Sequence, residues 1–135
     1  MMHRNFARIG ARIATLLLVL GMMATLASAE VYELRTYHTN EGKLDALKAR
    51  FRDHTIRIFN RHGMVSVGYF VPEDMPDTLI YILKHPNRKV AEQHWAEFQA
   101  DPEWQKKKAE SEVNGVLVQK VDRVWLDPTA FSALK

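Results

Sequence analysis

Residues 30–127 are predicted to form one α+β domain in the order strand, helix, strand, strand, helix, strand, which is the split βαβ arrangement of a ferredoxin-like fold. Residues 31–39, VYELRTYHT, alternate along a strand rich in β-branched and aromatic side chains. Residues 43–62 carry apolar side chains at steps of three and four, as one face of a helix requires. Residues 78–84, TLIYILK, form a nearly continuous apolar run typical of a buried central strand. This order places both helices on one face of an antiparallel sheet.

The first 29 residues have the layout of a secretory signal peptide and are set apart from the fold. A basic stretch with Arg4, Arg8 and Arg12 and no acid precedes an apolar run over residues 13–26, and a small-x-small cleavage pattern ends at Ala29. The apolar run is shorter than the roughly 20 residues that span a bilayer, which favours cleavage over a membrane anchor. We therefore expect export to the periplasm or the cell exterior, with no membrane span after cleavage.

Charge and cysteine content narrow the classes of partner. The chain has 19 Lys and Arg against 16 Asp and Glu, and removing the three arginines of the signal segment leaves 16 of each. Nucleic acid is not an expected partner, because phosphate neutralisation needs a basic surplus on one face. The chain contains no cysteine, which excludes disulfides, thiolate nucleophiles and Cys-ligated metals.

Turn and cap residues delimit the remaining elements. Gly63 is expected to end the first helix, and residues 64–71 to form the second strand. Asn87 is expected to cap a helix that runs to about residue 100. Asp101-Pro102 then restarts a helix, with Asp as the N-cap and Pro as the first helical residue.

The last predicted strand covers residues 116–126, and residues 128–135 form a short C-terminal tail. In the second strand, alternation puts Val65, Val67, Tyr69 and Val71 on one face and Phe70 on the other. Both helices cover the same face of the sheet, so the other face stays open although it is apolar. A second copy packed sheet against sheet would cover it, and we therefore expect a homodimer.

Several motifs together resemble the NIPSNAP family over roughly residues 31–127. They are YELRTY (32–37), Gly42-Lys43-Leu44, FRDHT…RHGM…VGYF, and ADPEW (100–104). The resemblance implies a dimeric α/β barrel, in a superfamily that also contains cofactor-free antibiotic-type monooxygenases and haem-degrading enzymes. It implies a cavity and no particular reaction, because NIPSNAP-like domains have no generally established activity.

Two histidines fall in the first predicted helix. His54 and His62 are eight residues apart, about 12 Å along a helix axis, whereas two ligands of one zinc stand at i and i+4. No metal site is therefore expected there. His62 beside Gly63 is explained by the helix end. His54 lies on the apolar stripe after Phe51 and is expected to point between helix and sheet, as a proton relay or as a hydrogen-bonded core residue.

A second set of candidates lies on the first strand. Glu33, Arg35 and Tyr37 stack on one of its faces, where they could orient an anionic or quinone-like ligand. They could equally form a cross-strand ion-pair ladder at the dimer interface, which is the interpretation that the pattern favours. His38 lies on the opposite face and is expected to share a cavity with His54.

Aromatic side chains are the third set. Tyr69, Tyr81 and Trp95 are candidates to line an apolar pocket, although in so small a domain most aromatics belong to the core. The sequence has no GxGxxG, P-loop, GxSxG or HExxH motif, which argues against nucleotide binding, serine hydrolysis and zincin chemistry. No cofactor is expected.

These observations leave three functional hypotheses. In the first, the domain binds a small apolar or aromatic molecule between helices and sheet, with His38, His54, Tyr69, Tyr81 and Trp95 as ligand-binding residues. In the second, the same cavity is that of a cofactor-independent monooxygenase or isomerase, with His54 as proton acceptor and Arg35 or Tyr37 stabilising an enolate-like anion. In the third, the domain is a protein–protein interaction module. Binding ranks slightly above interaction, and both rank above catalysis, because no activated nucleophile or paired acid and base is visible.

Overall fold

The computed structural model describes residues 29–135, so the predicted signal peptide lies, apart from Ala29, outside the described residues. The elements follow in the predicted order. They are β1 (Val31–Thr39), α1 (Leu44–Arg50), η1 (Phe51–Thr55), α2 (Ile56–Arg61), β2 (Val65–Phe70), β3 (Thr78–His85), α3 (Arg88–Ala100), α4 (Pro102–Ser111) and β4 (Val118–Leu126).

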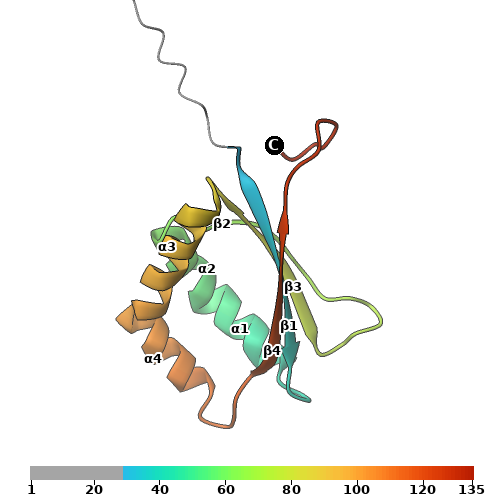
Figure 1. The fold of residues 1–135 in the computed structure, drawn as a ribbon. Coiled ribbons are helices and arrows are strands. Elements are labelled where there is room, and N and C mark those ends of the chain that lie inside the picture. Colours follow the sequence, from blue (N-terminus) through green and yellow to red (C-terminus); the bar gives the residue numbers. More distant parts are fainter. Residues whose placement is uncertain (1–28) are drawn as a thin grey trace, which may run out of the picture.

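The four strands form one antiparallel sheet in the order β2-β3-β1-β4. The helices all lie against one face of this sheet, and the other face is free of helices over the described residues (Figure 1). We call the two sides the inner and the outer face. The α+β, ferredoxin-like prediction is confirmed. In the part of the chain that the structure describes, no helix has the length and apolar content to cross a membrane.

The predicted caps are present. The Asn87 side chain accepts a hydrogen bond from the Val90 amide at 2.9 Å at the start of α3. The Asp101 side chain accepts from the Glu103 amide at 2.8 Å, and Pro102 opens α4. Gly63 ends α2 with φ at +71°, a conformation that glycine adopts without strain. Sequence alone therefore located these three element boundaries.

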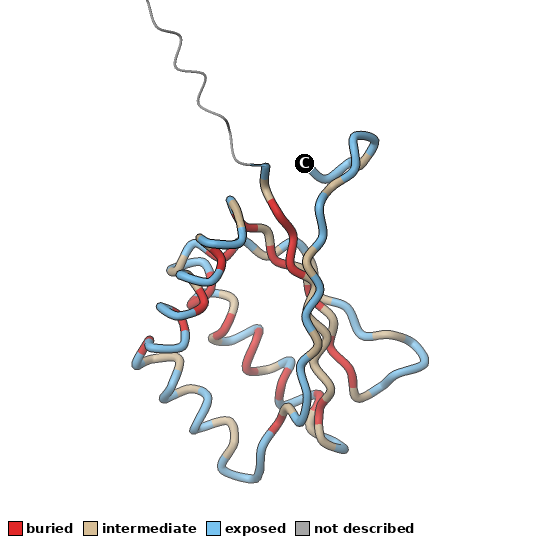
Figure 2. Tube along the Cα trace, in the orientation of Figure 1, coloured by how far each residue is buried: buried red, intermediate tan, exposed pale blue. Residues whose placement is uncertain are grey.

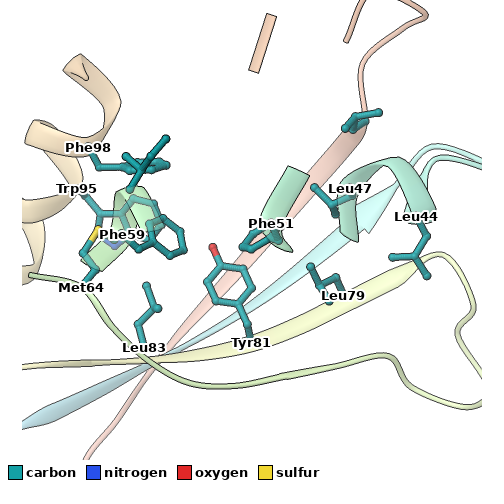
Figure 3. Packing of buried hydrophobic residues seen from close by; sticks show 12 residues of the cluster. Leu44, Leu47, Phe51, Phe59, Met64, Leu79, Tyr81, Leu83, Trp95 and Phe98 are labelled. Atoms are coloured by element: carbon teal, nitrogen blue, oxygen red, sulfur yellow. The ribbon is translucent and has the colours of Figure 1, made fainter. Parts of the chain in front are cut away.

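The hydrophobic core lies between the inner face and the helices, where the buried segments of the chain face one another (Figure 2). Figure 3 shows the Tyr81 and Leu83 side chains of β3 pointing towards Phe51 and Phe59 on the helical side. Edge-to-face and tilted aromatic contacts connect these rings, with Phe51 and Tyr81 centroids 5.2 Å apart. The central position of β3 confirms the prediction made from its apolar run.

The helix predicted over residues 43–62 is interrupted by one turn of π-helix, η1. The Ile56 amide donates to the Phe51 carbonyl, five residues back, rather than to the residue four back. Thr55 is buried, and its hydroxyl donates to the Arg50 carbonyl at 3.2 Å. Because α-helical spacing does not continue through this turn, Thr55 occupies the core position that simple periodicity assigned to His54.

The second strand also departs from simple alternation. Its pairing with β3 shifts between Ser66 and Gly68, which is a β-bulge. The expectation that Val65, Val67 and Tyr69 share one face is therefore wrong: Tyr69 packs on the inner face opposite Tyr81, whereas Val65 is exposed on the outer face. The predicted last strand starts two residues later than expected, at Val118.

Candidate functional site

Strand β1 directs its charged face towards the helices of the same chain. Glu33 accepts a hydrogen bond at 2.7 Å from the indole of Trp95 in α3, and the Tyr37 ring lies 5.9 Å from that of Phe51. The interpretation of Glu33, Arg35 and Tyr37 as a cross-strand ladder at a dimer interface is therefore wrong. Glu33 and Arg35 instead pair along one strand, at 2.8 Å.

Glu33 is the centre of a buried hydrogen-bond network. Its Oε2 accepts from His85 Nε2 at 3.0 Å and from Trp95 Nε1, and its Oε1 accepts from Arg35 Nη1. Burial alone would raise the pKa of the Glu33 carboxyl, but the hydrogen bonds from His85, Trp95 and Arg35 lower it below its usual 4.5. Glu33 is therefore ionised at neutral pH and fixes the position of the Arg35 side chain.

Arg35 lies between aromatic rings. Its guanidinium carbon is 4.2 Å from the centroid of the Trp95 ring and 5.6 Å from that of Tyr37, both within cation–π range. Burial opposes its charge, but the neighbouring Tyr37, Tyr81 and Glu33 raise the pKa of Arg35 above its usual value. The guanidinium thus stays charged inside a largely aromatic environment.

A cavity of about 460 Å³ opens beside this guanidinium, between the β1–β4 part of the inner face and the helices η1, α3 and α4. Its wall is mainly aromatic and apolar, with a few basic and amide groups. The lining residues are Arg35, Tyr37, Arg50, Phe51, Thr55, Phe59, Trp95, Phe98, Gln99, Trp104, Gln105, Lys108, Glu112, Val116, Val118 and Val121. Three predicted site residues, Arg35, Tyr37 and Trp95, are among them.

The helical wall supplies a second arginine that the sequence reasoning missed. Arg50 is only 3% exposed, and its Nη1 donates to Ser111 Oγ at 3.1 Å and to Glu112 Oε1 at 3.2 Å. Its guanidinium carbon lies 5.1 Å from the Trp104 ring. The signal was present in the sequence, because Arg50 follows Leu47 of the apolar stripe by three residues and so shares its face, where a charged side chain needs partners.

Two predicted tyrosines lie outside this cavity. Tyr81 is fully buried in the core 5.1 Å from the Tyr37 ring, and burial raises its pKa well above the usual value. Its hydroxyl has no hydrogen-bond partner among the described residues. The Tyr69 hydroxyl is bonded to Ser66 Oγ at 2.7 Å, and its ring lines a separate apolar depression of about 290 Å³ beside Phe70.

The two candidate histidines are not brought together. His54 lies in a shallow depression of about 320 Å³ between the first helix and α4, near Lys107 and Glu110. His38 is on the outer face, 2.8 Å from an Asp122 carboxylate oxygen. The expectation that they share a cavity is wrong, because the sheet separates them and the π turn moves His54 aside.

His62 has the structural role that its place at a helix end suggested. Its Nε2 lies 2.7 Å from Asp101 Oδ2, so it connects the end of α2 to the start of α4. Over residues 29–135, no three His, Asp or Glu side chains are grouped closely enough to hold a metal ion.

Comparison with known proteins places this architecture in a family. The chain is similar in structure to a NIPSNAP family protein of unknown function from Agrobacterium tumefaciens, at 26% identity over 80% of this chain and 96% of that chain, with a TM-score of 0.70. It is also similar to a NIPSNAP-like domain protein from Burkholderia xenovorans, at 19% identity over 78% and 90% of the two chains, with a TM-score of 0.69.

The fold extends to more distant proteins. A putative antibiotic biosynthesis monooxygenase from Chloroflexus aurantiacus aligns at 13% identity over 79% of this chain and 100% of that chain, with a TM-score of 0.55, which shows the fold alone. The search of curated proteins gave no match. The NIPSNAP family model matches residues 32–133, most of the chain, and the protein therefore belongs to the NIPSNAP family.

Proposed function

We propose that the protein binds a small aromatic or apolar molecule in the cavity beside Arg35, Tyr37 and Trp95. The observation that carries the proposal is the cavity itself, whose volume of about 460 Å³ lies within the roughly 300–1,000 Å³ typical of small-molecule sites. Protein interiors normally contain few voids larger than a water molecule. A cavity of this size in one small domain therefore supports a binding role.

The wall of the cavity favours a planar, apolar ligand. Phe98 and Trp104 pack together with centroids 4.5 Å apart, and Phe59 lies 4.7 Å from Phe98. Such rings offer flat surfaces against which another ring can stack. The amides of Gln99 and Gln105 add hydrogen-bonding groups on the same wall.

Cofactor-independent oxygenase or isomerase chemistry remains an alternative for the same cavity. Arg35 and Tyr37 would stabilise an anion that develops in the substrate. However, His54, the expected proton acceptor, lies in a different depression. Binding is therefore the function that we propose.

Two valines on opposite faces of β4 provide the test. Val121 lines the cavity, whereas Val124 lies on the outer face opposite Leu34. We expect Val121→Trp to fill the cavity and to weaken binding of the neutral fluorophore N-phenyl-1-naphthylamine at least tenfold, while Val124→Trp leaves the affinity of the cavity unchanged. Fluorescence titration measures both. Equal binding by the wild type and the Val121→Trp protein contradicts the proposal.

We further propose that the protein is a homodimer through the outer face. Val65, Phe70 and Val124 on that face are 52%, 55% and 50% exposed. Its charges are already paired within the chain, Lys120 with Asp122 and Lys84 with Glu30. An apolar surface whose charges are neutralised suits a second copy of itself.

Sedimentation of a charged variant tests the dimer. Val124→Lys places a cation on the proposed interface and is expected to give monomers at concentrations at which the wild type is dimeric. Val113→Lys, at an exposed position after α4, is the matched control and should remain dimeric. A wild-type protein that is monomeric at every concentration contradicts the homodimer. The outer face would then be a binding surface for a different protein.

Export is also a proposal, and it rests on the first 29 residues alone. The expected mature protein begins at Glu30 and is recovered from the periplasm or the medium. Mass spectrometry of the protein from fractionated cells checks the cleavage site. A full-length protein in the cytoplasm contradicts export.

A further inference from the structure

We infer that the ligand of this cavity carries an anionic group, a carboxylate or a similar oxyanion, on its aromatic body, and that Arg35 is the residue that binds this group. The inference rests on the proposed binding function and adds the chemical class of the ligand.

The charges around the cavity are unbalanced. Three cationic side chains line it, Arg35, Arg50 and Lys108, against one carboxylate, Glu112. Glu33 lies behind Arg35, outside the lining, and pairs with it at 2.8 Å, so the surplus around the cavity is one positive charge. The surplus of positive charge in a partly enclosed, aromatic space attracts an anion, because water there screens charge poorly.

Arg35 has donors left for such an anion. Among the described residues its guanidinium makes one hydrogen bond, from Nη1 to Glu33, and Nε has no partner although it is buried. Glu33 itself is shared, since His85 and Trp95 also donate to it. A planar oxyanion can accept two parallel N–H bonds from one guanidinium, which is the geometry that arginine favours.

The neighbouring strand increases the positive charge at this point. Arg123 of β4 pairs directly opposite Arg35 and therefore lies on the same face of the sheet. Like charges directly opposite each other in a sheet repel. Within residues 29–135 Arg123 forms no ion pair, and its guanidinium lies over Trp125, 5.3 Å from the ring centroid. An anion held at Arg35 would offset this repulsion.

The other two cations of the lining are less suited to the role. Arg50 also has an Nε without a partner among the described residues, but its Nη1 is paired with Glu112, a carboxylate of the lining itself, and its side chain is only 3% exposed. Lys108 is exposed and stands on α4, where water competes for its ammonium group. Arg35 combines charge, free donors and a fixed orientation over Trp95. We therefore assign the anion to Arg35 and a weaker, long-range attraction to Lys108.

A matched pair of probes tests the inference. 8-Anilinonaphthalene-1-sulfonate and N-phenyl-1-naphthylamine have the same aromatic body and differ by the sulfonate. We expect the wild type to bind the sulfonate at least tenfold more tightly than the neutral probe, as a charge-assisted hydrogen bond predicts. Arg35→Gln should abolish this preference, because it lowers the affinity for the sulfonate far more than the affinity for the neutral probe.

Three further variants test which residue causes the preference for the sulfonate and where the probes bind. They also serve as controls in case Arg35→Gln does not fold. Lys108→Gln removes an exposed charge with little risk to the fold and should weaken only the sulfonate, by about twofold to threefold at low salt. Lys89→Gln, an exposed lysine of α3 that lines none of the described cavities, should change nothing. Val121→Trp should reduce binding of both probes, which shows that both occupy this cavity.

The outcomes separate the inference from the function on which it rests. If the two probes bind equally well in the cavity, or if folded Arg35→Gln keeps the preference for the sulfonate, the inference is wrong and the proposed binding function stands. If neither probe binds the wild type, both proposals are wrong. If Arg35→Gln does not fold, as circular dichroism will show, Lys108→Gln decides: a sulfonate preference that this variant abolishes overturns the assignment to Arg35, and one that it largely keeps supports the assignment.

Discussion

Some charged side chains are buried on the inner face of the sheet, and some apolar side chains are exposed on its outer face. On the inner face, β1 presents Glu33, Arg35 and Tyr37 to the helices, and Glu33 is 0% exposed. On the outer face, apolar side chains such as Val65 and Phe70 are exposed in the single subunit. The distribution is the reverse of a simple rule in which charge faces water and apolar groups face the core.

The buried charges of the inner face and the exposed apolar side chains of the outer face have different physical explanations. The buried charges of the inner face are tolerated because each carboxylate oxygen of Glu33 has a donor, and because Arg35 lies over an aromatic ring. The outer face has no such network and gains stability only when another surface covers it. Variants on the two faces should therefore respond differently.

The largest contrast is expected from removing one carboxylate on each face. Glu33→Gln should lower the free energy of unfolding by about 3 kcal/mol, because it leaves the buried Arg35 charge without its counterion. Asp122→Asn on the outer face, where Asp122 is exposed and pairs with His38 and Lys120, should give no resolvable change. Urea denaturation at pH 7 measures both. Equal effects of the two substitutions would contradict the contrast.

Lowering the pH should reduce the difference in unfolding free energy between the wild type and Glu33→Gln. The folded-state pKa of Glu33 lies below its usual 4.5, so its charge stabilises the fold above about pH 4.5, and this contribution is lost as the pH falls through the folded-state pKa. The difference in unfolding free energy between the wild type and Glu33→Gln should therefore shrink steadily from pH 5 downwards. Urea titrations at stepwise lower pH measure it. A difference that is constant down to pH 3 would contradict the role of the charge.

The smallest expected effect concerns two tyrosine hydroxyls on the inner face. Tyr69→Phe should cost about 1 kcal/mol, because Ser66 loses its hydrogen-bond partner. Tyr81→Phe should be neutral or slightly stabilising, since it removes a buried hydroxyl that has no partner among the described residues. Thermal unfolding of the two variants decides the order. A larger loss from Tyr81→Phe would show that its hydroxyl is satisfied in solution.

Local patterns predicted the elements and their caps well. The Asn87 and Asp101 caps and the glycine stop at Gly63 depend on neighbouring residues only, and all three are present in the structure. The central strand β3 was also evident, because its apolar run has no close alternative. Signals of this kind need no knowledge of distant contacts.

The sequence did not predict in the same way which face of β1 points towards the helices. The composition of β1 does not determine which of its faces points towards the core. That orientation depends on His85 and Trp95, which lie 52 and 62 residues from Glu33. Likewise, the π turn near His54 has no sequence motif of its own, and the bulge at Gly68 was indicated only by an isolated glycine within a strand. Of the candidate residues, Arg35, Tyr37 and Trp95 line one cavity in the structure, whereas Arg50 of the same lining was missed.

The π turn also bears on how the length of the chain can vary. A turn bonded from i to i+5 holds one residue more than an α-helical turn, so η1 is a place where one residue can be lost while the helix on either side keeps its face towards the sheet. Deleting the exposed Asp53 should leave Phe51 and Ile58 in the core. Deleting Ala49 from α1 would instead rotate one part of the helix against the other by about 100°. Single-residue length differences among relatives should accordingly be found within residues 51–55.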